Sequence, residues 1–168
     1  PRIVVAIFLL ISIGMCGAAA AAPHITNVVL NITPKDICEQ NEVCITFHLV
    51  TAMQQGNGFY VWLDPNLCLR TNNTEDLADC IWITYNGGGG FHPDEVEIYR
   101  PTEYPEFVEN CSPYFAGCLV KMWLPQYIPN NKDVTICFGE CVDPSCPCFC
   151  SGYRVWVSND FDPCAWVV

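Results

Sequence analysis

Cysteine is the residue that most limits how this chain can fold. The sequence contains 13 cysteines, and five of them lie between residues 137 and 150, in the segment CFGECVDPSCPCFC. A zinc site built on cysteines needs two separated Cys pairs, or one Cys pair together with histidines. This segment has no second such pair downstream and no histidine nearby, and the C-x-x-C motif of thiol redox sites is missing from the chain. Disulfide bonding is therefore the predicted state of these sulfurs.

The N-terminal residues indicate an oxidising compartment. Residues 1–20 contain one positive charge, Arg2, an apolar run over residues 3–13, and the start of an alanine tract at residues 18–22. This pattern is typical of a secretory signal peptide with cleavage inside the alanine tract. The apolar run is shorter than the roughly 20 residues that a membrane span needs. We therefore predict a secreted, extracellular protein whose mature chain does not insert into a membrane.

Cleavage of the signal peptide removes Cys16 and leaves an even number of cysteines. An even set in a secreted chain indicates a disulfide framework. Short separations cost the least chain entropy to close, which favours Cys38 with Cys44, Cys68 with Cys80, and Cys111 with Cys118. The cysteine-dense segment 137–164 needs at least one bond that leaves its cluster of five, and Cys164 is the nearest partner. The predicted disulfide cysteines are Cys38, Cys44, Cys68, Cys80, Cys111, Cys118, Cys137, Cys141, Cys146, Cys148, Cys150 and Cys164.

Charge and size narrow the class further. The chain has 7 Lys and Arg against 18 Asp and Glu, a formal net charge of −11. Such a charge repels phosphate backbones and anionic membranes, so nucleic acid is not an expected partner. The 51% hydrophobic content excludes a disordered chain. Residues 21–168 have the length of a single domain.

Alternation of apolar and polar residues predicts strands along almost the whole mature chain. Each candidate is short, rich in β-branched or aromatic residues, and bounded by Pro, Gly, Asn or Asp. The predicted strands cover residues 24–33, 44–51, 58–64, 80–86, 95–100, 118–125, 133–138 and 153–159. This pattern predicts an all-β, disulfide-rich domain with little helix, built as an antiparallel β-sandwich or a jelly-roll-like barrel. One or two helical turns are expected in TNNTEDLADC, capped by Asn73 or Thr74. The NGGGG run at residues 86–90 is expected to form a wide, mobile loop between strands.

Strand parity sorts the aromatic residues. Residues two apart share one face of a strand, so four strands each place a tryptophan opposite their aliphatic residues. If these strands share one sheet, its outer surface is an aromatic platform with interleaved cations, suited to sugar rings or to a protein partner. The alternative is that the tryptophans cover disulfides or lie beneath loops, with the cations extended over them. The candidate binding residues are Tyr60, Trp62, Trp82, Trp123, Trp156, Lys121 and Arg154.

Two sequons are candidate N-glycosylation sites. They are Asn72, followed by Asn73 and Thr74, and Asn31, followed by Ile32 and Thr33. An Asn-x-Thr sequon in a secreted chain is a glycosylation acceptor when it lies on the surface.

Catalysis lacks an obvious nucleophile, because the cysteines are predicted to be oxidised and no G-x-S-x-G motif occurs. We therefore predict no catalytic residue, metal or cofactor. Histidine is nevertheless the usual ligand of copper and zinc, and carboxylates can hold calcium. The residues that leave these alternatives open are His24, His48 and His92 for a transition metal, and Asp160 with Asp162 or Asp94 with Glu95 for calcium.

The sequence thus favours a secreted or cell-surface, non-enzymatic recognition or structural domain that binds an extracellular protein or glycan. One alternative is a secreted, histidine-ligated metal oxidase or hydrolase. Another is a fragment of a larger adhesion or envelope glycoprotein. Convergence of the three histidines would distinguish the metal enzyme from the binding domain.

Overall fold

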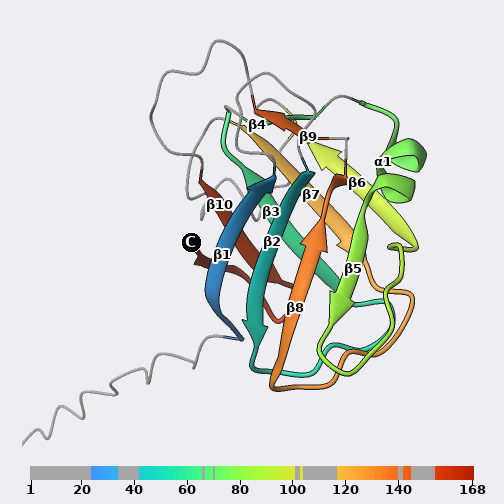
Figure 1. Cartoon of the computed structure of the whole chain (residues 1–168), viewed down its shortest axis with the longest axis vertical. Coiled ribbons are helices and arrows are strands. Elements are labelled where there is room, and N and C mark those ends of the chain that lie inside the picture. The colour runs from blue at the N-terminus through green and yellow to red at the C-terminus, as the bar shows by residue number, and fades with distance from the viewer. Residues whose placement is uncertain are drawn as a thin grey trace, which may run out of the picture.

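The protein is mostly β, with its main strands in two antiparallel sheets (Figure 1). The computed structural model describes residues 24–33, 42–65, 67–69, 71–100, 103, 117–139, 142–144 and 154–168. The four-stranded sheet has the order β1-β2-β8-β5, the five-stranded sheet the order β11-β10-β3-β7-β6, and β4 pairs with β9. The elements are β1 (Ile25–Thr33), β2 (Glu42–Leu49), β3 (Gly58–Leu63), β4 (Leu67–Leu69), α1 (Thr74–Cys80), β5 (Trp82–Tyr85), β6 (Glu95–Tyr99), β7 (Cys118–Trp123), β8 (Lys132–Cys137), β9 (Val142–Pro144), β10 (Val155–Asn159) and β11 (Asp162–Val167).

Each of the eight predicted strands overlaps an observed strand, so the mostly β prediction is confirmed. Strands β4, β9 and β11 were not predicted. The first two have 3 residues each, too few for alternation to be recognised. Strand β11 contains Pro163, which argues against a central strand. It forms because it pairs with β10 at the edge of the five-stranded sheet, where proline is tolerated.

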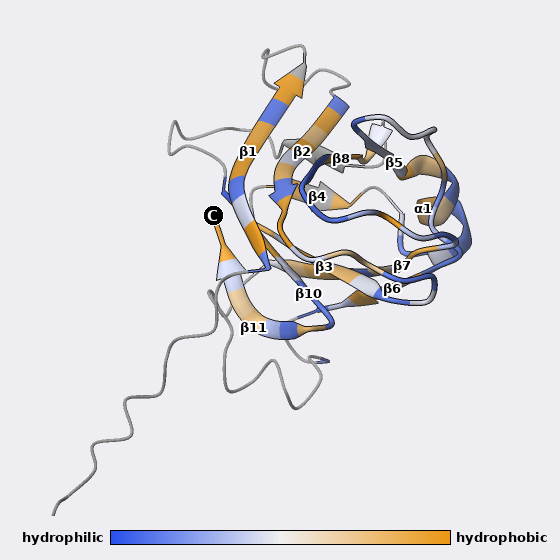
Figure 2. Ribbon diagram, turned by 90° about the horizontal axis from the view of Figure 1, so that it is seen from below, coloured by the Kyte–Doolittle hydropathy of each residue, from blue (hydrophilic) through white to orange (hydrophobic). Residues whose placement is uncertain are grey.

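The hydrophobic core lies between the two sheets. Along β2 the buried residues alternate with half-buried ones from Val43 to Leu49, as expected for a strand with one face on a core. Phe47 of β2 meets Phe59 of β3 edge to face, with ring centroids 5.1 Å apart, and this contact joins the two sheets. Figure 2 shows the strands of the four-stranded sheet on one side and those of the five-stranded sheet on the other, with α1 beside β6.

The short helix is confirmed, with Asn73 as its cap. The Asn73 side chain accepts a hydrogen bond from the Glu75 backbone N–H, which satisfies one of the unpaired donors at the helix start. Glu75 and Asp76 lie in the first turn, where negative charge is favourable. Leu77 anchors the helix in the core. No helix among the described residues has the length and apolar character needed to cross a membrane.

The glycine run does not form a wide loop. Ile83 and Phe91 exchange backbone hydrogen bonds, so residues 86–90 fold back on β5. A Cβ at Gly88 would stand 2.0 Å from the Tyr85 ring, and one at Gly90 would stand 2.4 Å from the Trp82 ring. A side chain at either position would displace the aromatic ring that occupies this space.

The disulfide pattern departs from the local pairing that chain entropy favours. Cys44 of β2 is bonded to Cys137 of β8, which lies directly opposite it in the sheet and 93 residues away in sequence. The prediction of a bond between Cys38 and Cys44 is therefore wrong. Cys80 and Cys164 are also disulfide-bonded. The predictions for the signal peptide at residues 1–20 and for the remaining cysteines fall outside the described residues and side chains, namely for Cys38, Cys68, Cys111, Cys141, Cys146, Cys148 and Cys150.

Cys118 is a free, buried thiol, so its predicted disulfide with Cys111 is wrong. It lies at the start of β7, where its side chain packs in the core between the sheets. Burial raises the pKa of Cys118 from 9.0 to about 11, against a weaker opposing effect of Arg100. A buried thiol of this kind behaves as a small apolar core residue.

We expect Cys118 to resist alkylation in the native protein and to react only after unfolding. The raised pKa alone reduces its thiolate fraction about 100-fold near pH 8, and burial slows attack further. Mass spectrometry of iodoacetamide-treated protein, native and in denaturant without reductant, measures this. Rapid native labelling, or no labelling after unfolding, would contradict a free buried thiol.

Between pH 9 and 11 the Cys118 thiol keeps its proton in the folded state and loses it in the unfolded state. The free energy of unfolding should therefore fall as pH rises from 9 to 11.

Candidate functional site

The four tryptophans that strand parity predicted on one surface lie on two different sheets. Trp62, Trp123 and Trp156 lie on the five-stranded sheet, on β3, β7 and β10, whereas Trp82 lies on β5 of the four-stranded sheet. The condition that all four strands share one sheet is therefore not met. Parity fixes the face of a strand but carries no information about the sheet to which the strand belongs.

Trp62 is the centre of a second, smaller hydrophobic cluster on the outer face of the five-stranded sheet. It is 0% exposed and packs with buried Tyr60 and Leu119. Trp166 of β11 meets it edge to face at 5.7 Å, and half-buried Trp156 completes the contact from β10. Trp62 and Tyr60 are therefore buried in the packing of the protein.

The polar groups of this face are also engaged within the molecule. The Lys121 ammonium lies 4.1 Å from the centroid of the Trp123 ring and 5.2 Å from that of Tyr60, a cation–π arrangement. The Tyr60 hydroxyl donates to Asp160, 2.8 Å away, which also accepts from the Gly58 N–H. Burial, followed by the bond to Asp160, raises the pKa of Tyr60 above its ordinary value. Of the remaining candidate residues, Arg154 is exposed directly before β10.

Trp82 is the exposed tryptophan of the predicted set, with 42% of its surface accessible. Its indole packs against the Gly90 backbone and meets the His92 ring edge to face, with centroids 4.7 Å apart. The Nδ1 atom of His92 is 2.7 Å from the Ile81 carbonyl oxygen. Because a carbonyl oxygen only accepts, Nδ1 carries the proton and Nε2 of neutral His92 is an acceptor. We call Trp82, Gly90 and His92 the Trp82 platform.

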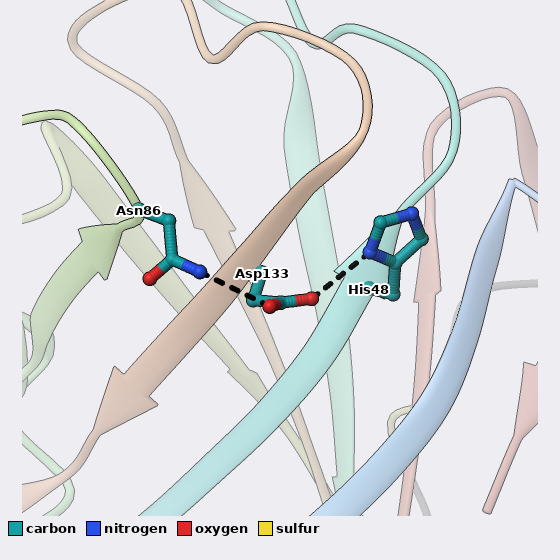
Figure 3. A network of polar contacts seen from close by, with 3 residues as sticks. All are labelled: His48, Asn86 and Asp133. Carbon is teal, nitrogen blue, oxygen red and sulfur yellow. Dashed lines mark hydrogen bonds and ion pairs between the residues drawn. The ribbon is translucent and has the colours of Figure 1, made fainter.

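The outer face of the four-stranded sheet beside this platform is polar. Asp133 of β8 accepts from His48 of β2 at 2.9 Å and from the Asn86 amide at 3.0 Å (Figure 3). One row along, Thr46 and Thr135 are hydrogen-bonded across the same two strands at 3.0 Å. The Cys44–Cys137 disulfide forms the next row, and Trp82 is the Cα partner of Cys137. The platform therefore lies at the β5 edge of a face that carries hydroxyl, amide and carboxylate groups.

The three histidines do not converge on a metal site. His24 bonds the Thr51 hydroxyl at 2.8 Å, while His48 bonds Asp133 and His92 bonds a backbone carbonyl. Within the described part of the chain, the one group of three ligand-type side chains that meet is Glu42, Cys44 and Cys137. Its two sulfurs are bonded to each other, so they are not available as thiolate ligands.

The acidic pairs that the sequence offered for calcium form other hydrogen bonds or are exposed. Asp160 accepts from Gly58 and Tyr60, and Asp162 accepts from the Cys164 N–H at 3.2 Å. Asp94 and Glu95 are exposed at the start of β6. In the described ranges these carboxylates form no cluster of three ligands.

Both sequon asparagines are exposed. Asn31 lies on edge strand β1, opposite Cys44 of β2. Asn72 precedes α1 and accepts a hydrogen bond from the Arg100 guanidinium.

Sequence reasoning included Trp82 but missed Gly90 and His92, which hold it. The available signal was the run of four glycines at residues 87–90, directly after a strand that contains Trp82 and Tyr85. Comparison of the chain with protein-family models, curated proteins and solved structures finds no match.

Proposed function

We propose that this chain is a secreted, non-enzymatic recognition domain, built as an antiparallel β-sandwich, that binds an extracellular glycan through the Trp82 platform. The observation that carries the proposal is the 42% exposure of a tryptophan that neighbouring residues nevertheless hold in place. An exposed and fixed aromatic ring contributes contact area at a low cost in conformational entropy.

A glycan fits the surroundings of Trp82 better than an apolar protein surface does. The adjoining face carries threonine hydroxyls, the His48–Asp133–Asn86 network and an acceptor at His92 Nε2, and all of these can bond sugar hydroxyls. The net charge of −11 disfavours acidic polymers. A neutral oligosaccharide is therefore the expected ligand class.

The separation of the histidines counts against the metal-enzyme alternative. Each of the three uses Nδ1 for a different partner, and the partners lie on different elements. A catalytic metal would need at least three protein ligands around one point. The arrangement instead supports binding without chemistry.

We expect Trp82→Ala to weaken binding to a neutral oligosaccharide at least tenfold, because a tryptophan at the centre of a contact supplies about 1.4 kcal/mol or more. A panel of immobilised neutral glycans identifies the ligand, and titration calorimetry measures the loss. Tyr127→Ala is the matched control, since Tyr127 is a similarly exposed aromatic, at 47%, outside the platform. Absence of glycan binding by the wild type, or equal affinities for the wild type and Trp82→Ala, would overturn the proposal. Capture of a protein partner that is insensitive to glycosidase would also count against it.

A further inference from the structure

Among the described residues, β1 is one edge strand of the four-stranded sheet, and it exposes an apolar side chain there. Val29 is 52% accessible and points to the outer face, because its Cα partner Thr46 lies on that face. A long edge strand with exposed apolar groups is a template for pairing with another chain. Asn27, with φ of 55°, and the register shift between Thr26 and Val29 distort only the first part of this edge. The part from Val29 to Thr33 carries no such distortion.

Asn31 lies in this regular part, on the same outer face as Val29 and two residues beyond it. It is exposed, and its amide makes no hydrogen bond to the described residues. Asn72 differs, because its side-chain oxygen is held by Arg100 next to the start of α1, away from the edge of the sheet.

We propose that Asn31 carries an N-linked glycan, and that this glycan covers Val29 and the free edge of β1, so that two copies of the chain do not pair through this strand. The proposal rests on passage through the secretory route, which the proposed function also requires. The donor is a lipid-pyrophosphate-linked oligosaccharide. The Asn31 Nδ2 atom forms the new bond to the anomeric carbon, the bond from that carbon to the pyrophosphate oxygen breaks, and the proton lost from Nδ2 leaves with the lipid pyrophosphate.

The glycan and the Trp82 platform fit on the same face. Asn31, Cys44, Cys137 and Trp82 form one row across β1, β2, β8 and β5. With neighbouring strands about 4.8 Å apart, Asn31 and Trp82 are separated by roughly 14 Å. A glycan on Asn31 therefore shields the β1 edge and leaves the opposite edge, with Trp82, open to a ligand.

The test uses the full chain, preceded by an initiator methionine and expressed in secretory eukaryotic cells. Peptide mapping after glycosidase treatment, which converts a glycosylated Asn to Asp, should locate a glycan at Asn31. Asn31→Gln and Thr33→Ala should both lose this glycan, and light scattering should show at least a doubling of the average mass at high concentration. Thr33→Ser keeps the sequon and should behave as the wild type, and Asn72→Gln should remain monomeric. Adding Val29→Lys to Asn31→Gln should restore the monomer.

A secreted chain with unmodified Asn31 would overturn this inference, as would an Asn31→Gln variant that stays monomeric. Neither result affects the proposed function, because Trp82-dependent glycan binding is measured separately on the same preparations. Conversely, a chain that is glycosylated at Asn31 but binds no neutral oligosaccharide would overturn the proposed function alone. Retention of the chain in the cytosol would overturn both.

Discussion

Replacing Cys44 and Cys137 together by serine is expected to lower the free energy of unfolding by about 4–5 kcal/mol. The bond closes a loop of 93 residues between neighbouring strands, and chain-entropy arguments give a bond that closes about 100 residues a value near 4.7 kcal/mol. The loop contains all of β3, β5, β6 and β7, so the unfolded chain gains much conformational freedom when the bond is lost. Urea unfolding followed by far-ultraviolet circular dichroism measures the change.

The Thr46 and Thr135 pair is the matched control for this result. It lies one row along the same two strands and is joined by a hydrogen bond alone. Changing both residues to valine keeps their shape and should alter stability by about 1 kcal/mol or less. If the serine variant loses no more than the valine variant, the covalent link between β2 and β8 does not contribute as expected.

Trp62→Ala is expected to cost about 3–5 kcal/mol, the range for removal of a buried large aromatic side chain. Trp62 is 0% exposed and packs against Tyr60, Leu119 and Trp166 in the outer cluster. Its loss therefore leaves a cavity among these side chains. Chemical unfolding monitored by circular dichroism is suitable, because tryptophan fluorescence itself changes in the variant.

Trp82→Ala provides the comparison, since it removes the same side chain from an exposed position. Its expected cost in stability is below about 1 kcal/mol. Trp62→Phe should lie between the two and remains measurable if Trp62→Ala does not fold. Equal stability losses for Trp62→Ala and Trp82→Ala would contradict the distinction between a packing tryptophan and a binding tryptophan.

The sequence predicted the parts of the site that depend on local pattern. Trp82 was assigned to a strand and to the face opposite Ile81 and Ile83, and both of these residues are buried. The sequence could not predict that residues 86–90 fold back over that strand. The fold of residues 86–90 over β5 depends on the Ile83–Phe91 pairing and on the Tyr85 and Trp82 rings that pack against glycines. No repeating pattern in the sequence indicates these contacts.

The sequence alone determined the β class, the approximate positions of eight strands and the short helix with Asn73 or Thr74 as its cap, because each depends on neighbours a few residues away: alternation for strands and a single side chain for the cap. Only the tertiary structure decided which strands share a sheet. That assignment placed Cys44 beside Cys137, left Cys118 as a thiol, buried Trp62 and exposed Trp82. The physical reason is that the period of a strand fixes the face to which a side chain points, whereas the strand's partners and whatever covers that face are set by contacts far apart in the chain.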